Sequence, residues 1–140
     1  MNDKTLAILK PDCLERNLTG IAIDFILNKG FKIKAMKMLH MSKADAERFY
    51  AVHKGKPFYD ELLEYMSSGP CIPMVLEKEN AVEAFREAIG TTDPRKAAEN
   101  TLRRLYAKNM QRNTVHGSDS EENAQKEIAF FFPLKEIMLY

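Results

Sequence analysis

Thr5-Leu6-Ala7-Ile8-Leu9 is a short, almost wholly apolar run, and Lys10-Pro11 follows it directly. A continuous apolar run of this length predicts a strand that is buried on both of its faces. Proline lacks the backbone N–H that a strand ladder requires, so Pro11 ends the strand. This stretch therefore predicts the central strand of a sheet, and the other elements are placed around it.

The next two elements are predicted from a change in hydrophobic period. Residues 18–26 repeat apolar side chains at helical spacing, with Asn17 as the N-cap and Gly30 at the C-terminal cap. Residues 31–41 then alternate between apolar and basic side chains, which predicts a long strand. The alternation slips near Met36, and this slip predicts a β-bulge.

Two short helices and a strand come next. Ser42 has Asp45 three residues after it, which predicts a helix that opens with a capping box. Apolar side chains within residues 62–66 predict a further short helix. Residues 71–76 predict a strand, in which Pro73 indicates either an edge position or a bulge.

The last third of the chain is the hardest to assign. Residues 81–88 predict a helix that Gly90 ends. Residues 91–115 contain no clear strand, and a short helix around Leu102 stays open. A connection of this length is usually functional or disordered, and its polar side chains favour a functional loop. Residues 128–132 predict the last strand.

The order strand, helix, strand, helices, strand, helix, long loop, strand matches the βαββαβ arrangement. It predicts an α+β fold of the ferredoxin-like class, a four-stranded antiparallel sheet with helices covering one face and a long loop before the last strand. The chain has 140 residues and no internal repeat or linker. We therefore expect residues 1–140 to form a single domain with a sizeable core.

Composition excludes several functional classes. The formal net charge is +1, so no global field recruits nucleic acid or an anionic membrane, and an anion site must come from local clustering. Cys13 and Cys71 are the only cysteines, and their separation fits neither a metal site nor a Cys-x-x-Cys motif. Free thiols, no basic leader and no apolar run of ~18 residues predict a cytoplasmic protein.

The most informative chemical motif is Asn113-Thr114-Val115-His116-Gly117-Ser118-Asp119. A lone histidine is often structural, but a neutral imidazole beside a glycine can attack phosphorus without a metal. Such a ring needs a partner that fixes its tautomer, and Glu127, at the start of the last predicted strand, is the candidate. Ser118 has two interpretations, since it either forms a capping box with Glu121 or holds Glu127 in place.

Three cations and one hydroxyl are candidates for a polyphosphate site: Lys10, Arg86, Arg103 and Thr92. Each has a simpler interpretation, because a strand-end lysine can snorkel, an arginine can be solvated, and Thr92 can belong to a turn. The chain contains no Gly-x-x-x-x-Gly-Lys-Ser/Thr loop, no Gly-x-Gly-x-x-Gly motif and no Gly-x-Ser-x-Gly elbow. A P-loop enzyme and a serine hydrolase are therefore disfavoured.

Read together, these residues closely resemble the nucleoside diphosphate kinase family, over nearly the whole chain from about Thr5 to Phe132. The Asn-x-x-His-Gly-Ser-Asp signature at residues 113–119 is highly specific. Four more motifs agree with it: Leu9-Lys10-Pro11-Asp12, Lys56-Pro57-Phe58-Tyr59, Ser67-Ser68-Gly69-Pro70 and Thr92-Asp93-Pro94.

The resemblance implies a ping-pong reaction. A nucleoside triphosphate would give its terminal phosphoryl group to His116, at Nδ1, and a nucleoside diphosphate would then take the group from it. Magnesium would be held chiefly by the nucleotide. The resemblance assigns the polyphosphate and the sugar to Lys10, Tyr50, Arg86, Thr92, Arg103 and Asn113, with Tyr50 close to His116.

The resemblance also implies how the base is held. Phe58 would stack on the base, with Met110 opposite it. Stacking on an aromatic ring and a flexible thioether gives affinity without reading base edges, which predicts broad base and sugar specificity. Family members form tetramers or hexamers, so a homo-oligomer is expected.

One stretch departs from the family pattern. Many members carry a glycine just before the Thr-Ile/Leu-Arg of the long loop, where this chain has Asn100-Thr101-Leu102-Arg103. Asparagine is the residue that best replaces glycine at positive φ, so we expect the turn to survive.

Two alternatives to an active kinase stay open. One is a binding or regulatory module on the same fold that has lost catalysis, which the presence of His116 and its neighbours argues against. The other is a nucleic-acid-binding protein that uses an open face of the sheet, with Lys32, Lys34 and Lys37 as a weak basic stripe.

Overall fold

The computed structural model describes residues 3–91, 93–107 and 114–140. Its centre is a four-stranded sheet in the order β2-β3-β1-β4, and all three pairings are antiparallel. The strands are β1 (Lys4–Leu9), β2 (Lys32–Met36), β3 (Ile72–Glu77) and β4 (Val115–Gly117). The apolar run that opens the chain is an interior strand, as its composition predicts, and the ferredoxin-like α+β class is confirmed.

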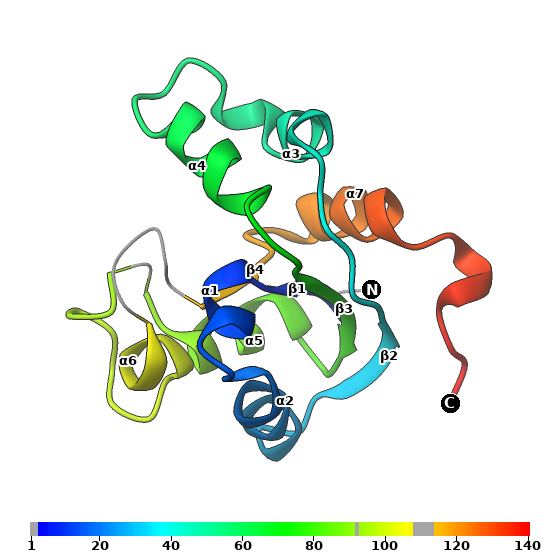
Figure 1. Ribbon diagram of the computed structural model, residues 1–140. Coiled ribbons are helices and arrows are strands. Elements are labelled where there is room, and N and C mark those ends of the chain that lie inside the picture. The colour runs from blue at the N-terminus through cyan, green and yellow to red at the C-terminus, as the bar shows by residue number, and fades with distance from the viewer. Residues whose placement is uncertain (1–2, 92, 108–113) are drawn as a thin grey trace.

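Helices cover both faces of the sheet, so the prediction of one covered face is wrong (Figure 1). Because side chains alternate along a strand, Leu6 and Ile8 of β1 face one core cluster, and Ala7 and Leu9 face another. The first cluster includes residues of α3 (Lys43–Phe49), α4 (Tyr59–Met66) and α7 (Glu121–Phe131). The second includes residues of α1 (Pro11–Glu15), α2 (Thr19–Asn28), α5 (Ala81–Ile89) and α6 (Leu102–Tyr106).

The last strand lies earlier in the chain than predicted. Residues 128–132 belong to the end of α7 and the residue after it, and the strand is β4 at Val115–Gly117. The run from Ile128 to Phe132 is short and apolar, and periodicity alone cannot separate a strand from a buried helix in such a run. The whole of α7 shows the helical period, since Ala124 and Phe131 are buried and Ile128 packs beside them.

Local signals upstream have mixed outcomes. The capping box of Ser42 and Asp45 is present, but Asn17 does not cap α2, whose N-cap position is Leu18 without a side-chain bond. Regular pairing in β2 ends at Met36, and its register shifts between Ile33 and Ala35, close to the predicted bulge. The strand is thus shorter than residues 31–41.

The remaining segments fit the sequence in part. β3 is an interior strand, so an edge position for Pro73 is wrong. Lys37 donates its amide to the Pro73 carbonyl just beyond β2, where regular pairing has stopped. Asn100 has φ +64°, as its replacement of glycine predicts, and α6 forms the short helix left open in the long connection. Two 3-10 helices, Ala51–His53 and Leu134–Glu136, complete the described elements.

Candidate functional site

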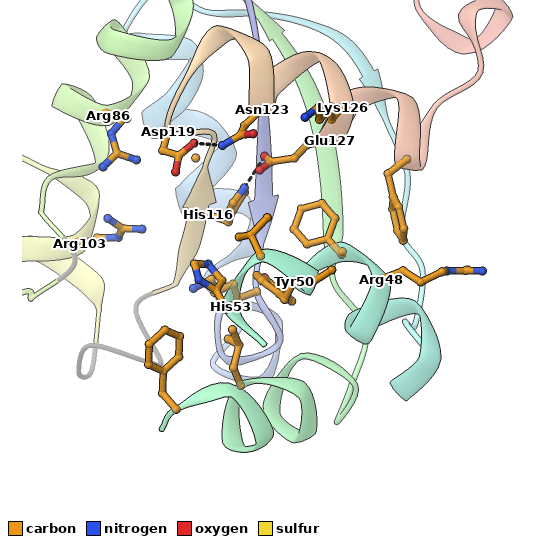
Figure 2. Close-up of a pocket in the computed structure, with 18 residues that line it drawn as sticks. Arg48, Tyr50, His53, Arg86, Arg103, His116, Asp119, Asn123, Lys126 and Glu127 are labelled. Atoms are coloured by element: carbon orange, nitrogen blue, oxygen red, sulfur yellow. Dashed lines mark hydrogen bonds and ion pairs between the residues drawn. The ribbon is translucent and has the colours of Figure 1, made fainter. Parts of the chain in front are cut away.

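A cleft of about 690 Å³ lies beside β4 (Figure 2). It is bounded by α7, by residues near α5 and α6, and by α3, α4 and the residues that connect them, which we call the α3–α4 arm. It brings together residues that are far apart in the sequence. Nine of the sequence-predicted or motif residues line it: Lys10, Tyr50, Phe58, Arg86, Arg103, His116, Gly117, Asp119 and Glu127.

His116 is the middle residue of β4 and pairs with Ile8 of the central strand. Its Nε2 lies 2.8 Å from Oε1 of Glu127, which reaches it from α7. When Nε2 carries the proton and donates a hydrogen bond to the carboxylate, the free lone pair of the neutral ring lies on Nδ1. The arrangement can therefore present an unprotonated ring nitrogen as a nucleophile.

Ser118 holds the same carboxylate and does not cap a helix. Its hydroxyl donates to Oε1 of Glu127 at 2.8 Å and accepts from the Leu6 amide at 3.2 Å. The N-cap of α7 is Ser120, whose hydroxyl accepts from the Asn123 amide, so the predicted capping box with Glu121 is wrong. Glu127 is thus fixed through Ser118 to the central strand.

Lys10, Arg86 and Arg103 line one part of the cleft, and Figure 2 shows the two arginines on the same side of His116. Lys10 is only 7% exposed, and burial and then Arg103 lower its pKa to about 7, against the opposing effect of Asp12. Burial and then Arg86 lower the pKa of Arg103 to about 10. Three crowded cations of this kind attract an anion strongly.

Arg103 also braces the strand that carries the histidine. Its guanidinium donates to the carbonyls of Gly90 at 3.0 Å and Val115 at 2.9 Å. Its Nε is buried and has no hydrogen-bond partner among the described residues. A ligand oxygen at that position would satisfy a donor that is otherwise orphaned.

The aromatic wall of the cleft comes from the α3–α4 arm. Tyr50 is 6% exposed, burial raises its pKa, and its hydroxyl has no partner within the described part of the chain. Phe58 is 45% exposed at the mouth of the cleft. Between them lies His53, whose ring centroid is 5.5 Å from that of Phe58. Such a wall offers an apolar stacking surface and a buried donor.

Sequence reasoning missed His53, although it follows Tyr50 by three residues and helical spacing would place both on one side. Burial and then Lys56 lower the pKa of His53. It also missed Asn123, which donates to the Asp119 carboxylate at 2.6 Å on the opposite rim (Figure 2). Four more lining residues come from α3 and α7 without a local motif: Arg48, Phe49, Lys126 and Phe130.

Three predicted site residues, Thr92, Met110 and Asn113, lie outside the described residues. Within the described ranges, no group of three or more His, Cys, Asp or Glu side chains could hold a metal ion. Nor does any helix there have the length and apolar character to cross a membrane.

An antiparallel α+β domain with a carboxylate-oriented histidine opposite crowded cations has the features of a phosphotransferase that acts on polyphosphates. A sequence model of the nucleoside diphosphate kinase family matches residues 3–137. A nucleoside diphosphate kinase of Chloroherpeton thalassium is 59% identical over 134 residues, which cover 96% of this chain and 95% of that protein.

Solved structures agree with the sequence comparison. A nucleoside diphosphate kinase of Aquifex aeolicus has a TM-score of 0.94 at 44% identity and covers 97% of this chain and 99% of its own. A halophilic nucleoside diphosphate kinase of Halobacterium salinarum, solved in complex with CDP, has a TM-score of 0.94 at 34% identity, with coverage of 100% and 93%. The chain belongs to the nucleoside diphosphate kinase family, and it is a phosphotransferase.

Proposed function

We propose that this chain transfers the terminal phosphoryl group of a nucleoside triphosphate to a nucleoside diphosphate through a phosphohistidine on His116. The observation that carries the proposal is the chain of hydrogen bonds from the Leu6 amide through Ser118 and Glu127 to Nε2 of His116. It fixes one ring nitrogen and leaves Nδ1 to react.

In the first half-reaction, Nδ1 of His116 attacks the terminal phosphorus. A P–N bond forms, the P–O bond to the leaving diphosphate breaks, and its electron pair stays on the diphosphate oxygen. In the second half-reaction, an oxygen of a new nucleoside diphosphate attacks the same phosphorus. The P–N bond then breaks and its electron pair returns to Nδ1, so the enzyme is regenerated.

Phosphoryl transfer depends on alignment and charge neutralisation more than on covalent chemistry by the protein. Arg86 and Arg103 hold phosphate oxygens, and Thr92 joins them. Lys10 and Asn113 hold the ribose hydroxyls, while the buried hydroxyl of Tyr50 faces the transferred group. Nε of Arg103 and the hydroxyl of Tyr50 are the buried groups whose missing partners a polyphosphate would supply.

The base is held without readout of its edges. Phe58, partly exposed at the cleft mouth, stacks on one face of the base, and Met110 covers the other. Broad specificity for bases and for ribose or deoxyribose follows from this mode of binding. The CDP complex of the Halobacterium salinarum relative supports a nucleotide in this fold.

Magnesium arrives with the nucleotide. The cleft offers Lys10, Arg86 and Arg103 as cations for the phosphates that would carry the ion. A magnesium ion on the phosphates neutralises part of their charge. We also propose a homo-oligomer, a tetramer or a hexamer, in the cytoplasm.

Incubation of the pure protein with magnesium and ATP labelled at the terminal phosphate tests the proposal. The protein should gain label that is stable in base and labile in acid, and His116→Ala should gain none. His40→Ala is the matched control, since His40 lies outside the cleft and bonds the Ser67 carbonyl, and it should label like the wild type. A wild-type protein that binds ATP and never labels would favour the regulatory alternative.

The surroundings of the sheet favour the kinase over the nucleic-acid alternative. Both faces of the sheet are covered, so no open face remains among the described elements. Lys34 is buried beside Glu77, and Lys37 pairs with Glu136 at 3.3 Å. Lysines that are buried or paired attract phosphate backbones weakly, which leaves Lys32 as the exposed member of the stripe.

A further inference from the structure

Asp12 is a buried carboxylate that the transfer steps above do not use. It lies in the first turn of α1 and is 2% exposed. Burial of a carboxylate costs free energy because the group loses its hydration, and hydrogen bonds and opposite charges must compensate that cost. Its partners come from three different parts of the structure, and each part carries a residue of the cleft.

The first partner is Thr114, which directly precedes β4, the strand that carries His116. Thr114 is fully buried, and its φ of +75° is strained for a β-branched residue. Its hydroxyl lies 3.5 Å from Oδ2 of Asp12, and its carbonyl accepts from the Lys10 amide at 2.9 Å. Burial raises the pKa of the Asp12 carboxyl, while Lys10 and then a Thr114 backbone hydrogen bond lower it. The carboxylate thus holds a strained turn two residues before His116.

The second partner anchors the arm that forms the aromatic wall. Tyr65, near the end of α4, donates its hydroxyl to Oδ1 of Asp12. That hydroxyl also accepts from the Asp12 amide at 3.1 Å. Tyr65 is 5% exposed, and the same helix places Leu62 in the cleft, with Phe58 just before it.

The third partner is the charge of Lys10. Arg103 crowds this lysine, and Asp12 is the carboxylate that opposes the crowding. Arg86, His116 and Glu127 line the same cleft, and Arg16 faces Asp12 from the end of α1. Without a carboxylate at position 12, the lysine would lose its proton more readily.

We propose that Asp12 is a positioning residue of the phosphoryl-transfer reaction, which ties Lys10, the Thr114 turn and the base of α4 into one unit. The inference rests on the proposed function, because it assumes that His116 accepts the phosphoryl group. Asp12 touches no reacting atom. Through the Thr114 turn it fixes the position of His116, and its negative charge keeps Lys10 protonated when a nucleotide binds.

The decisive variant is Asp12→Asn, with the exposed Asp24→Asn of α2 as a control of equal charge change. Asp12→Asn should slow phosphoenzyme formation about tenfold or more, since small displacements of reacting groups have large effects on rate. ADP affinity should decline with rising pH in both proteins, and in Asp12→Asn the decline should occur about one pH unit lower than in the wild type. The reason is that the variant lacks the negative charge of Asp12, which supports the protonated form of Lys10. Asp24→Asn should change neither quantity.

Two outcomes overturn the inference. One is an Asp12→Asn protein that matches Asp24→Asn in rate and in pH profile. The other is a slower Asp12→Asn protein whose pH profile for ADP is unchanged, because that result assigns Asp12 to the fold alone. If the wild type never labels, the proposed function fails, while the pH profile of ADP affinity still measures the effect of Asp12 on Lys10.

If Asp12→Asn does not fold, Tyr65→Phe takes its place. It keeps the carboxylate and removes one of its hydrogen-bond donors. Phosphoenzyme formation should be several-fold slower than in Tyr59→Phe, a matched change at the other end of α4. Equal rates in these two variants would refute the inference.

Discussion

The two edge strands of the sheet are built in opposite ways. β4 is three residues long, and around it lie buried polar groups, among them Ser118, Thr114 and Arg103. β2 is longer, and the C-terminal residues cover part of its edge, where Met138 donates its amide to the Lys34 carbonyl at 2.8 Å. The β4 edge borders the candidate cleft, whereas the β2 edge is partly covered by the chain itself.

From this difference we expect the β4 edge to favour function over stability and the β2 edge to contribute mainly to stability. Buried cations and a left-handed threonine at the β4 edge destabilise the fold, and they persist because their neighbours hold them. At the β2 edge, Lys32 and Lys34 lie 4.9 and 4.7 Å from the centroid of the Tyr140 ring. Changes at β4 should therefore alter catalysis strongly, and changes at β2 should alter only stability.

Glu127→Gln should give the largest effect on catalysis short of removing His116 itself. The amide is nearly isosteric but cannot stabilise the ring as a carboxylate does, so phosphoenzyme formation should slow about a hundredfold. Glu122→Gln on the same helix is the control, because the Glu122 side chain is 79% exposed and its carboxylate pairs with Lys126. Rapid-quench labelling measures both, and equal rates would remove Glu127 from its assigned role.

Lys10→Met tests whether the β4 edge is destabilised by its own cation. The native pKa of Lys10 is about 7 and the unperturbed value is 10.5. Between these two pH values the unfolded chain binds more protons at this lysine than the native protein does. The free energy of unfolding therefore rises with pH in this range. Lys10→Met should be more stable than wild type by about 2 kcal/mol at pH 7, and the gain should shrink as the pH approaches 10.

Denaturant unfolding at several pH values measures this effect, and nucleotide affinity should fall in the same variant. Lys4 is the first residue of β1, the strand that Lys10 directly follows, and its side chain is 37% exposed. Lys4→Met should change stability by no more than about 0.5 kcal/mol. A Lys10→Met protein less stable than wild type at neutral pH would show that the buried lysine stabilises the β4 edge.

Gly117→Ala tests how closely β4 is packed against the second core cluster. A Cβ at Gly117 would lie 2.8 Å from Cδ2 of Phe85 and 3.1 Å from Cδ1 of Ile89. Since Phe85 is buried, the variant should lose about 1–2 kcal/mol of stability and shift His116. Gly20→Ala in α2 has nothing within 4 Å, and it should gain up to about 1 kcal/mol. Chemical denaturation of both proteins compares the two.

The sequence predicts the central strand and the order of most elements, because those signals are local. It misplaces the last strand, since the apolar run from Ile128 to Phe132 resembles a strand until its helical period with Ala124 is seen. It also misses the second covered face. Which side of a sheet a helix covers depends on long-range packing, which no local period records.

The candidate site shows the same division. His116, Ser118 and Glu127 lie within one stretch of chain, and the structure brings them into hydrogen-bond contact as their chemistry suggests. Asp12 and Thr114 are 102 residues apart, so no spacing in the sequence indicates that they meet. His53 joins the cleft only because the α3–α4 arm folds back beside β4.

Tyr140→Ala should give the smallest effect, and it completes the comparison from the β2 side. The tyrosine hydroxyl donates to the Ile33 carbonyl at 2.5 Å, and the ring covers two lysines. Its loss should lower stability by about 1 kcal/mol, since exposed cation–π contacts and single hydrogen bonds are each worth about that much or less. Leu139→Ala is the neighbouring control, because Leu139 is 99% exposed.

Tyr140→Phe separates the two contributions, since it keeps the ring over the lysines and removes only the hydrogen bond. In all three variants the rate of phosphoenzyme formation should equal that of the wild type, because β3 and β1 separate the β2 edge from His116. A slower rate in Tyr140→Ala, with unchanged labelling in Leu139→Ala, would mean that closure of the β2 edge is transmitted through the sheet. The two edges would then be coupled, and the division between a functional and a structural edge would not hold.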